Sequence, residues 1–235
     1  NIKDFDAGIV YQEKRSSNTT YNKSIGEKYL DQNTLWDIAF LNGFVKYSNT
    51  RNEKWKEFAT LYYRNATLQP NTVFSIEKAT DTTSGKQVGY YRPNQLIGFE
   101  NQLNYYATDY LVITGGIVGE AEQLSDGFSI TNSISETTLP PRPQSPNMIN
   151  NYLFSYYLQG QVKIFKSLSF TGGFRHDFSS YYKQVLTPRA GLVFNNNQLT
   201  IKLLYGDAFR AAKPWDYNYG IGNNNLKPEK MHSLE

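Results

Sequence analysis

Cysteine is absent from the 235-residue sequence, so the chain has neither a disulfide framework nor a thiolate metal site. There are only two histidines, His176 and His232, and neither has another metal-ligating side chain at a suitable spacing. No window approaches a run of about 18 apolar residues, which excludes a helical membrane protein, in line with a mean hydropathy of -0.58. The net charge of +3 is too small and too evenly spread to indicate a nucleic-acid partner.

Recognisable catalytic motifs are absent as well. The segment TSGKQ, residues 83–87, lacks the first glycine of a phosphate-binding loop and is better read as a turn. The sequence has no Gly-x-Ser-x-Gly elbow. Ser169 and His176 fall on opposite faces of an alternating segment, so they do not form a nucleophile and its base. We therefore expect no enzyme activity and no bound cofactor.

Aromatic residues and a period of two are what the sequence has in abundance. Tyrosine (19) and phenylalanine (14) are both frequent. In one segment Leu199, Ile201 and Leu203 share a face opposite Thr200 and Lys202. Such segments run for about 10 to 15 residues, whereas a globular strand has about five or six and a strand tilted across a bilayer needs about 9 to 11. A barrel strand is apolar only at every second position, so low mean hydropathy is compatible with a membrane barrel.

The spacing of these segments supports the same fold class. We predict strands at residues 5–11, 35–46, 55–67, 95–106, 110–120, 150–164, 168–178, 186–194 and 198–210, and a tenth beginning near Leu226. Long connections (12–34, 68–94 and 121–149) alternate with short ones (47–54, 107–109, 165–167 and 195–197), and residues 179–185 form a medium one. Transmembrane barrels alternate short periplasmic turns with longer outer loops, whereas a soluble sandwich has no reason to do so. The sequence therefore predicts an antiparallel transmembrane β-barrel, with residues 211–225 in an outer loop.

From Tyr152 onward the sequence resembles the barrel of TonB-dependent outer-membrane receptors. Four boxes carry the resemblance: a Gly-x-Arg-x-Asp strand at 173–177, a Thr-Pro-Arg strand start at 187–189, a Tyr-Gly-x-x-Phe-Arg-Ala box at 205–212, and an Asn-x-x-Leu-Lys-Pro-Glu box at 223–229. Ala212 and Asn224 stand where the family usually has proline. The order and spacing of the boxes are specific to the family, whereas the first 150 residues contain no sharp family motif and resemble it only in their general pattern.

The resemblance implies a 22-stranded barrel with a plugged lumen, in the outer membrane of a Gram-negative bacterium. Residues 1–235 then form a partial barrel domain of roughly ten strands, with an N-terminal plug and the remaining strands outside this sequence. The implied partners are TonB, which acts through the plug region, outer-membrane lipids and a small-molecule ligand. The implied function is active import of an iron chelate such as a siderophore, with cobalamin or a glycan as other ligand classes. Haem receptors of the family place a histidine between the last two boxes, and this sequence has none there.

Two other functions remain open from the residues alone: a passive, porin-like outer-membrane channel, and a soluble β-rich binding module such as a lectin.

Five residues are candidates for contacts inside the lumen or with the plug. Arg175, Lys202 and Arg210 alternate onto the polar face of their strands, and Arg189 does so on its own strand. Glu229 matches a family position whose lumenal carboxylate pairs with plug arginines. Candidates for ligand contact in the outer loop are Trp215, Tyr217 and Tyr219.

Overall fold

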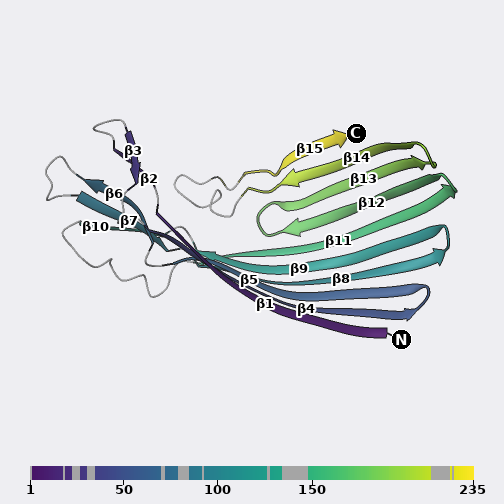
Figure 1. Ribbon diagram of the computed structural model, residues 1–235, viewed down its shortest axis with the longest axis horizontal. Coiled ribbons are helices and arrows are strands. Elements are labelled where there is room, and N and C mark those ends of the chain that lie inside the picture. Colours follow the sequence, from purple (N-terminus) through teal and green to yellow (C-terminus); the bar gives the residue numbers. More distant parts are fainter. Residues whose placement is uncertain are drawn as a thin grey trace.

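The computed structural model describes residues 2–17, 19–22, 27–30, 35–69, 72–78, 85–91, 93–125, 128–133, 148–212, 223 and 225–235. The regular elements in these ranges are all β-strands (Figure 1). Within the same ranges, no helix has the length and apolar character needed to cross a membrane.

Ten strands form one antiparallel sheet in which each strand pairs with the next one along the chain, apart from the small strands of the loops. In order they are β1 (Ile2–Ser16), β4 (Trp36–Asn52), β5 (Trp55–Leu68), β8 (Asn94–Thr108), β9 (Leu111–Ser125), β11 (Met148–Phe165), β12 (Leu168–Ser179), β13 (Lys183–Asn195), β14 (Thr200–Arg210) and β15 (Glu229–Leu234). Among the described residues the sheet is open, with β1 and β15 at its edges. The predicted fold class and all ten predicted strands are confirmed, although most strands extend further than predicted.

Short turns join the strands at one end of the sheet, here called the turn end. Asparagine side chains close two of these turns. The side chain of Asn52 accepts hydrogen bonds from the backbone N–H groups of Lys54 (2.9 Å) and Trp55 (3.0 Å). The side chain of Asn196 does the same for Gln198 (2.9 Å) and Leu199 (2.8 Å). Asparagine favours such turns because its short side chain replaces a backbone acceptor.

The opposite end, here called the loop end, carries the long connections (Figure 1). They contain five short strands: β2 (Thr19–Asn22), β3 (Glu27–Leu30), β6 (Val73–Lys78), β7 (Gly85–Tyr91) and β10 (Phe128–Ser133). β2 pairs with β3, and β7 lies between β6 and β10. The sequence did not predict these strands. The connection predicted at 179–185 is in fact only a three-residue turn, residues 180–182, because β13 begins at Lys183.

The register divides the side chains into two faces. One row across the sheet runs Val45, Leu61, Phe99, Gly119, Phe154 and Phe178, and the adjacent row, on the other face, runs Lys46, Thr60, Glu100, Val118, Ser155 and Asp177. We call these the apolar face and the polar face.

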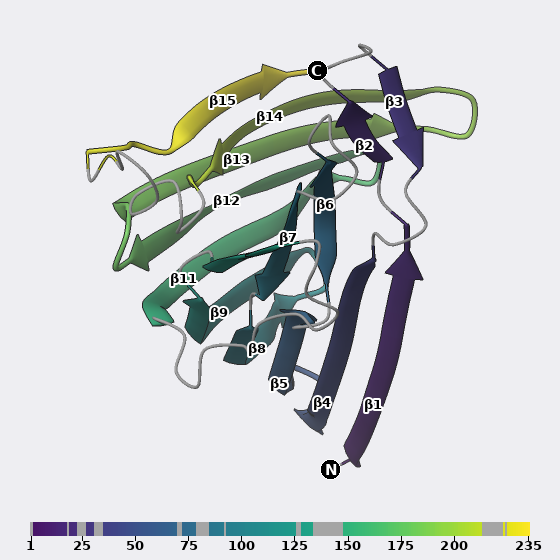
Figure 2. The same cartoon turned by 90° about the vertical axis from the view of Figure 1, so that its left-hand side faces the viewer.

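The polar face is the concave one. The sheet curves strongly from β1 round to β15 (Figure 2). Side chains converge on the inside of a curved sheet and diverge on its outside. On the polar face Ser155 and Asp177 are buried, with exposed fractions of 0% and 2%, whereas Phe154 and Leu158 on the apolar face are 50% and 47% exposed. The concave side is therefore lined by polar groups, and the convex side is apolar.

The register can be tested by cross-linking, because the chain has no native cysteine. Leu192 lies opposite Leu203 on adjacent strands, and directly opposed residues are about 4.5–5.5 Å apart, within the range a disulfide spans. We expect the Leu192→Cys/Leu203→Cys variant of the full-length protein to form an intramolecular disulfide under mild oxidation, measured by thiol titration. The Leu192→Cys/Leu204→Cys variant is the control, because its second thiol lies on the other face; efficient cross-linking of that pair instead would contradict the register.

Candidate functional site

The polar face carries several hydrogen-bonded sets of polar side chains. Its carboxylates Glu100, Glu120 and Glu122 lie on β8 and β9 and are half-buried. Hydroxyl and amide groups hold each of them, whereas no described lysine or arginine lies within ion-pair distance of any of the three.

Tyr62 on β5 reaches across one strand to the next. Its ring lies over Gly98 of β8, its cross-strand partner, and its hydroxyl donates a hydrogen bond to Glu120 of β9. A methyl group at Gly98 would occupy the space of the tyrosine ring. The guanidinium of Arg64 lies over the same ring, 5.0 Å from its centroid, a favourable cation–π geometry.

Tyr157 on β11 makes the same kind of contact in the opposite direction. Its ring lies over Gly116 of β9, and its hydroxyl lies 3.3 Å from Glu100 and 3.0 Å from Gln102, both on β8. Together the two tyrosines link β5, β8, β9 and β11 through side chains as well as through the backbone.

Arg175 organises the most buried polar group on this face. Its Nε donates to Asp177 Oδ1 (2.8 Å) and its Nη2 donates to Ser155 Oγ (3.0 Å), while Ser155 donates to the same Asp177 oxygen (2.6 Å). Asp177 is 2% exposed, and its second oxygen has no hydrogen-bond partner among the described residues. A buried carboxylate requires such pairing, because an isolated charge there would be costly. The Gly-x-Arg-x-Asp box is thus explained: Gly173, Arg175 and Asp177 all point to the polar face, and a side chain at Gly173 would collide with the backbone of Leu158 and Gln159.

At the loop end, amides surround Glu122. Asn94 (3.5 Å) and Asn151 (3.2 Å) donate to its two carboxylate oxygens, and Asn151 in turn accepts hydrogen bonds from Ser179 and Ser180. Burial and the charge of Glu122 raise the pKa of Tyr181, in the turn between β12 and β13.

The register places all five lumen candidates on the polar face. Arg189 pairs with Gly206, Lys202 with Val193, and Arg210 with Glu229. Arg210 and Glu229 form an exposed ion pair at 2.8 Å, which contributes little to stability. Arg189 and Lys202 are exposed, whereas Arg175 is engaged with Asp177. The loop candidates Trp215, Tyr217 and Tyr219 lie outside the described residues.

Both histidines lie on the apolar face. His176 contacts the Tyr156 hydroxyl at 3.0 Å, and His232 contacts Asp207 at 2.7 Å. Within the described ranges there is no group of three or more histidine, aspartate or glutamate side chains that could hold a metal ion.

Sequence analysis missed the tyrosines and glutamates of β5, β8, β9 and β11. Tyr62 and Gly98 are far apart in the chain, and only the strand register brings them together. The available signal was the alternation of polar or small residues with apolar ones along β8 (Gly98, Glu100 and Gln102) and β9 (Gly116, Glu120 and Glu122). Such alternation shows which residues share a face, but it does not show which residues they contact.

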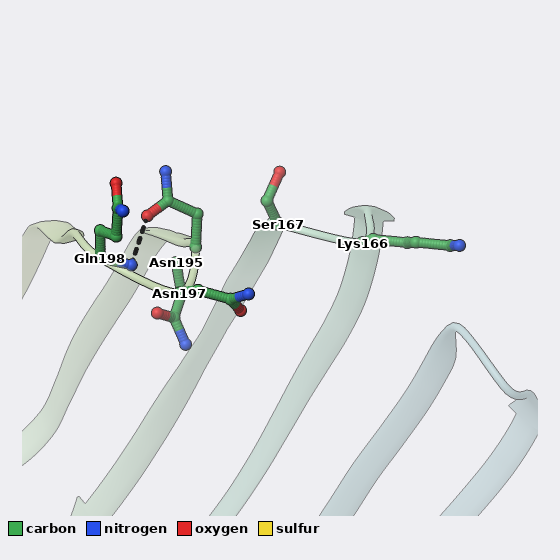
Figure 3. Close-up of a pocket in the computed structure, with 6 residues that line it drawn as sticks. Lys166, Ser167, Asn195, Asn197 and Gln198 are labelled. Atoms are coloured by element: carbon green, nitrogen blue, oxygen red, sulfur yellow. Dashed lines mark hydrogen bonds between the residues drawn. The ribbon is translucent and has the colours of Figure 1, made fainter.

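A separate hollow of about 460 Å³ lies at the turn end, lined by Lys166, Ser167, Asn195, Asn196, Asn197 and Gln198. Figure 3 shows the labelled side chains of the 195–198 turn beside Lys166 and Ser167. The hollow contains a single charged side chain and lies away from the polar face, so it is not the candidate site.

Comparison with known proteins gives a family and a fold. Residues 2–235 match the family model described as "TonB dependent receptor-like, beta-barrel". No curated protein sequence matches. Among solved structures, a mutant ferric enterobactin receptor from Pseudomonas aeruginosa is 15% identical with a TM-score of 0.65, and the match covers 97% of this chain and 36% of that one.

Two further structures share the fold. The RagAB peptide transporter is 14% identical with a TM-score of 0.55, covering 85% of this chain and 28% of that one. The siderophore receptor PirA from Pseudomonas aeruginosa is 14% identical with a TM-score of 0.51, and the match covers 96% of this chain and 44% of that one. The chain therefore spans between about a quarter and a half of the length of these structures.

The contact between Tyr157 and Gly116 can be tested by adding one methyl group. We expect Gly116→Ala to lower the free energy of unfolding by about 1–3 kcal/mol, because the methyl would displace the Tyr157 ring, break its hydrogen bonds and collide with the backbone oxygen of Asn101. The measurement is denaturant-induced unfolding of the full-length protein in detergent.

Gly119→Ala is the matched control, because Gly119 lies on the same strand with open space where the methyl would be. That substitution should be neutral, or stabilising by up to about 1 kcal/mol through the unfolded state. Equal free energies of unfolding for the two variants would show that the position of the Tyr157 ring does not require a glycine at residue 116.

Proposed function

Because the chain belongs to the TonB-dependent receptor β-barrel family, we propose that it forms part of the wall of an outer-membrane receptor that actively imports an iron chelate such as a siderophore. The apolar face contacts lipid and the polar face lines the lumen. The receptor performs no chemistry on its ligand. Its barrel domain includes further strands, and a plug domain lies within the lumen.

The aromatic residues of the apolar face support the membrane orientation. Near the turn end, Trp55 and Tyr105 stack with ring centroids 4.2 Å apart. A second cluster lies closer to the loop end and consists of Tyr156, His176 and Phe178, in which the His176 and Phe178 rings are 4.3 Å apart. Membrane barrels carry aromatic girdles at both interfaces, with an apolar band between them. Exposed Leu158 lies between the two clusters in the register.

The observation that carries the proposal is the polar concave wall. Tyrosine and asparagine donors hold the three glutamates in place, while Arg189 and Lys202 are exposed on the polar face and have no ion-pair partner in the described part of the chain. A rigid wall that presents fixed charges of both signs suits a plug that binds when closed and is released when pulled. TonB supplies the pull through the plug region.

Uptake by living cells tests the proposal. We expect cells that express the full-length receptor to accumulate radiolabelled ferric siderophore only when TonB is functional. Arg189→Ala and Lys202→Ala should each lower the rate by about tenfold, the value of one charged hydrogen bond to the plug. Lys166→Ala is the control, because it removes the same charge in a turn away from the lumen wall.

Siderophore uptake that is unaffected by loss of TonB, together with steady conductance in planar bilayers, would contradict active transport and favour a passive channel. TonB-dependent uptake of a peptide or cobalamin instead would retain the mechanism and replace the ligand class.

A further inference from the structure

The convex face carries a row of uncharged hydrogen-bonding side chains at the loop end of β5, β8, β9 and β11. Its members, here called the amide row, are Thr67, Asn65, Tyr63, Gln95, Gln123 and Asn150. Each is hydrogen-bonded to the next, with distances of 2.8, 3.5, 3.3, 2.6 and 3.1 Å along the row. The side chains of Gln95, Gln123 and Asn150 are exposed. The row contains no charged residue.

The amide row has hydrogen-bonding capacity left over. An amide has two N–H donors and an oxygen with two lone pairs. Along the row Gln95 and Gln123 each donate once, so each has a second N–H directed elsewhere. Exposed amides of this kind are costly against acyl chains, which places the row at the level of lipid headgroups. Neutral donors and acceptors in a line suit the hydroxyl groups of a sugar better than a phosphate, which arginine and lysine bind more strongly.

An apolar groove begins directly below the amide row. It has a volume of about 580 Å³, and Gly43 forms its floor. In the register Gly43 lies between Ile9 of β1 and Tyr63 of β5, and Tyr63 lies beside Ile97 of β8. Val45 and Leu61 continue the groove toward the turn end. A Cβ added at Gly43 would have no neighbour closer than 3.9 Å, so the floor is open.

Tyr63 joins the two features. Its ring lines the groove, and its hydroxyl donates to Gln95 in the amide row at 3.3 Å. Ile97, another groove residue, is two positions from Gln95 on the same face of β8. An amphipathic molecule with one alkyl chain in the groove would therefore place its headgroup on the row.

We propose that this convex surface is a binding site for a membrane glycolipid, with an acyl chain over Gly43 and sugar hydroxyls on the amide row. The orientation rests on the membrane location proposed above, whereas the specificity for a sugar headgroup does not follow from it. Lipid that merely surrounds a barrel needs no such arrangement of amides above a groove.

Native mass spectrometry of the full-length receptor, released from a polyoxyethylene detergent, provides the test. The probes are a glucosyl diacylglycerol and a phosphatidylcholine with identical acyl chains. We expect the glycolipid to bind more tightly, and Gln95→Ala and Gln123→Ala each to reduce that preference by about two- to tenfold, the range for one hydrogen bond. Gln184→Ala is the control, because Gln184 is an exposed amide at the same end of the sheet but outside the row.

The groove is tested separately by filling it. Gly43→Leu should weaken binding of both lipids, whereas Gly119→Leu, on the apolar face but outside the groove, should leave it unchanged. Equal binding of the two probes, tighter binding of an anionic phosphatidylglycerol, or no effect of Gly43→Leu would each overturn the glycolipid site while leaving the receptor in the membrane. A full-length protein that stays soluble without detergent would instead remove the membrane location, and the site with it.

Discussion

A strand that crosses lipid must find partners for its backbone N–H and C=O groups within the protein, because hydrocarbon offers none. Each strand between the two edges of this sheet meets that condition by pairing with a neighbour on either side. The pairing also fixes which side chains share a face. Once the rows are aligned, Leu158 and Phe154 are exposed on the convex side, and Ser155 and Tyr157 belong to the concave side. The division into an apolar surface and a polar surface follows from the backbone ladder.

The same ladder sets how large side chains fit inside the curve. On a concave wall, directly paired residues of neighbouring strands lie too close together for both to have large side chains. Tyr62 and Tyr157 are therefore each paired with a glycine, over which the ring lies. Their hydroxyls then reach carboxylates one strand further on. Cross-strand contacts of this kind stiffen the wall between β5 and β11. In the proposed transport function, a stiff wall of this kind keeps its shape while the plug is released.

The sequence predicted those parts of the structure that depend on local pattern. Period two located all ten long strands, and turn residues such as Asn52 and Asn196 marked where the chain reverses. The predicted strands at 5–11 and 110–120 end before β1 and β9 do in the structure. Both strands continue past the apolar band with polar residues, such as Lys14 and Gln123, in which apolar and polar positions no longer alternate. The face of Arg175 was predictable from the same alternation, whereas Glu229 was assigned to the lumen from the family resemblance alone. The contacts of Tyr157 with Gly116 and Glu100 were not, because they depend on a register that joins distant parts of the chain.

The central claim is that one face of this sheet meets lipid and the other meets water. Single spin labels at successive positions from Asn151 to Gln161 on β11 test it directly, in the full-length protein reconstituted into lipid bilayers. The account predicts that collision with lipid-soluble oxygen peaks at Tyr152, Phe154, Tyr156 and Leu158, and that collision with a water-soluble nickel complex never peaks at these positions. A profile without a period of two, or with its oxygen peaks at Ser155 and Tyr157, would contradict it.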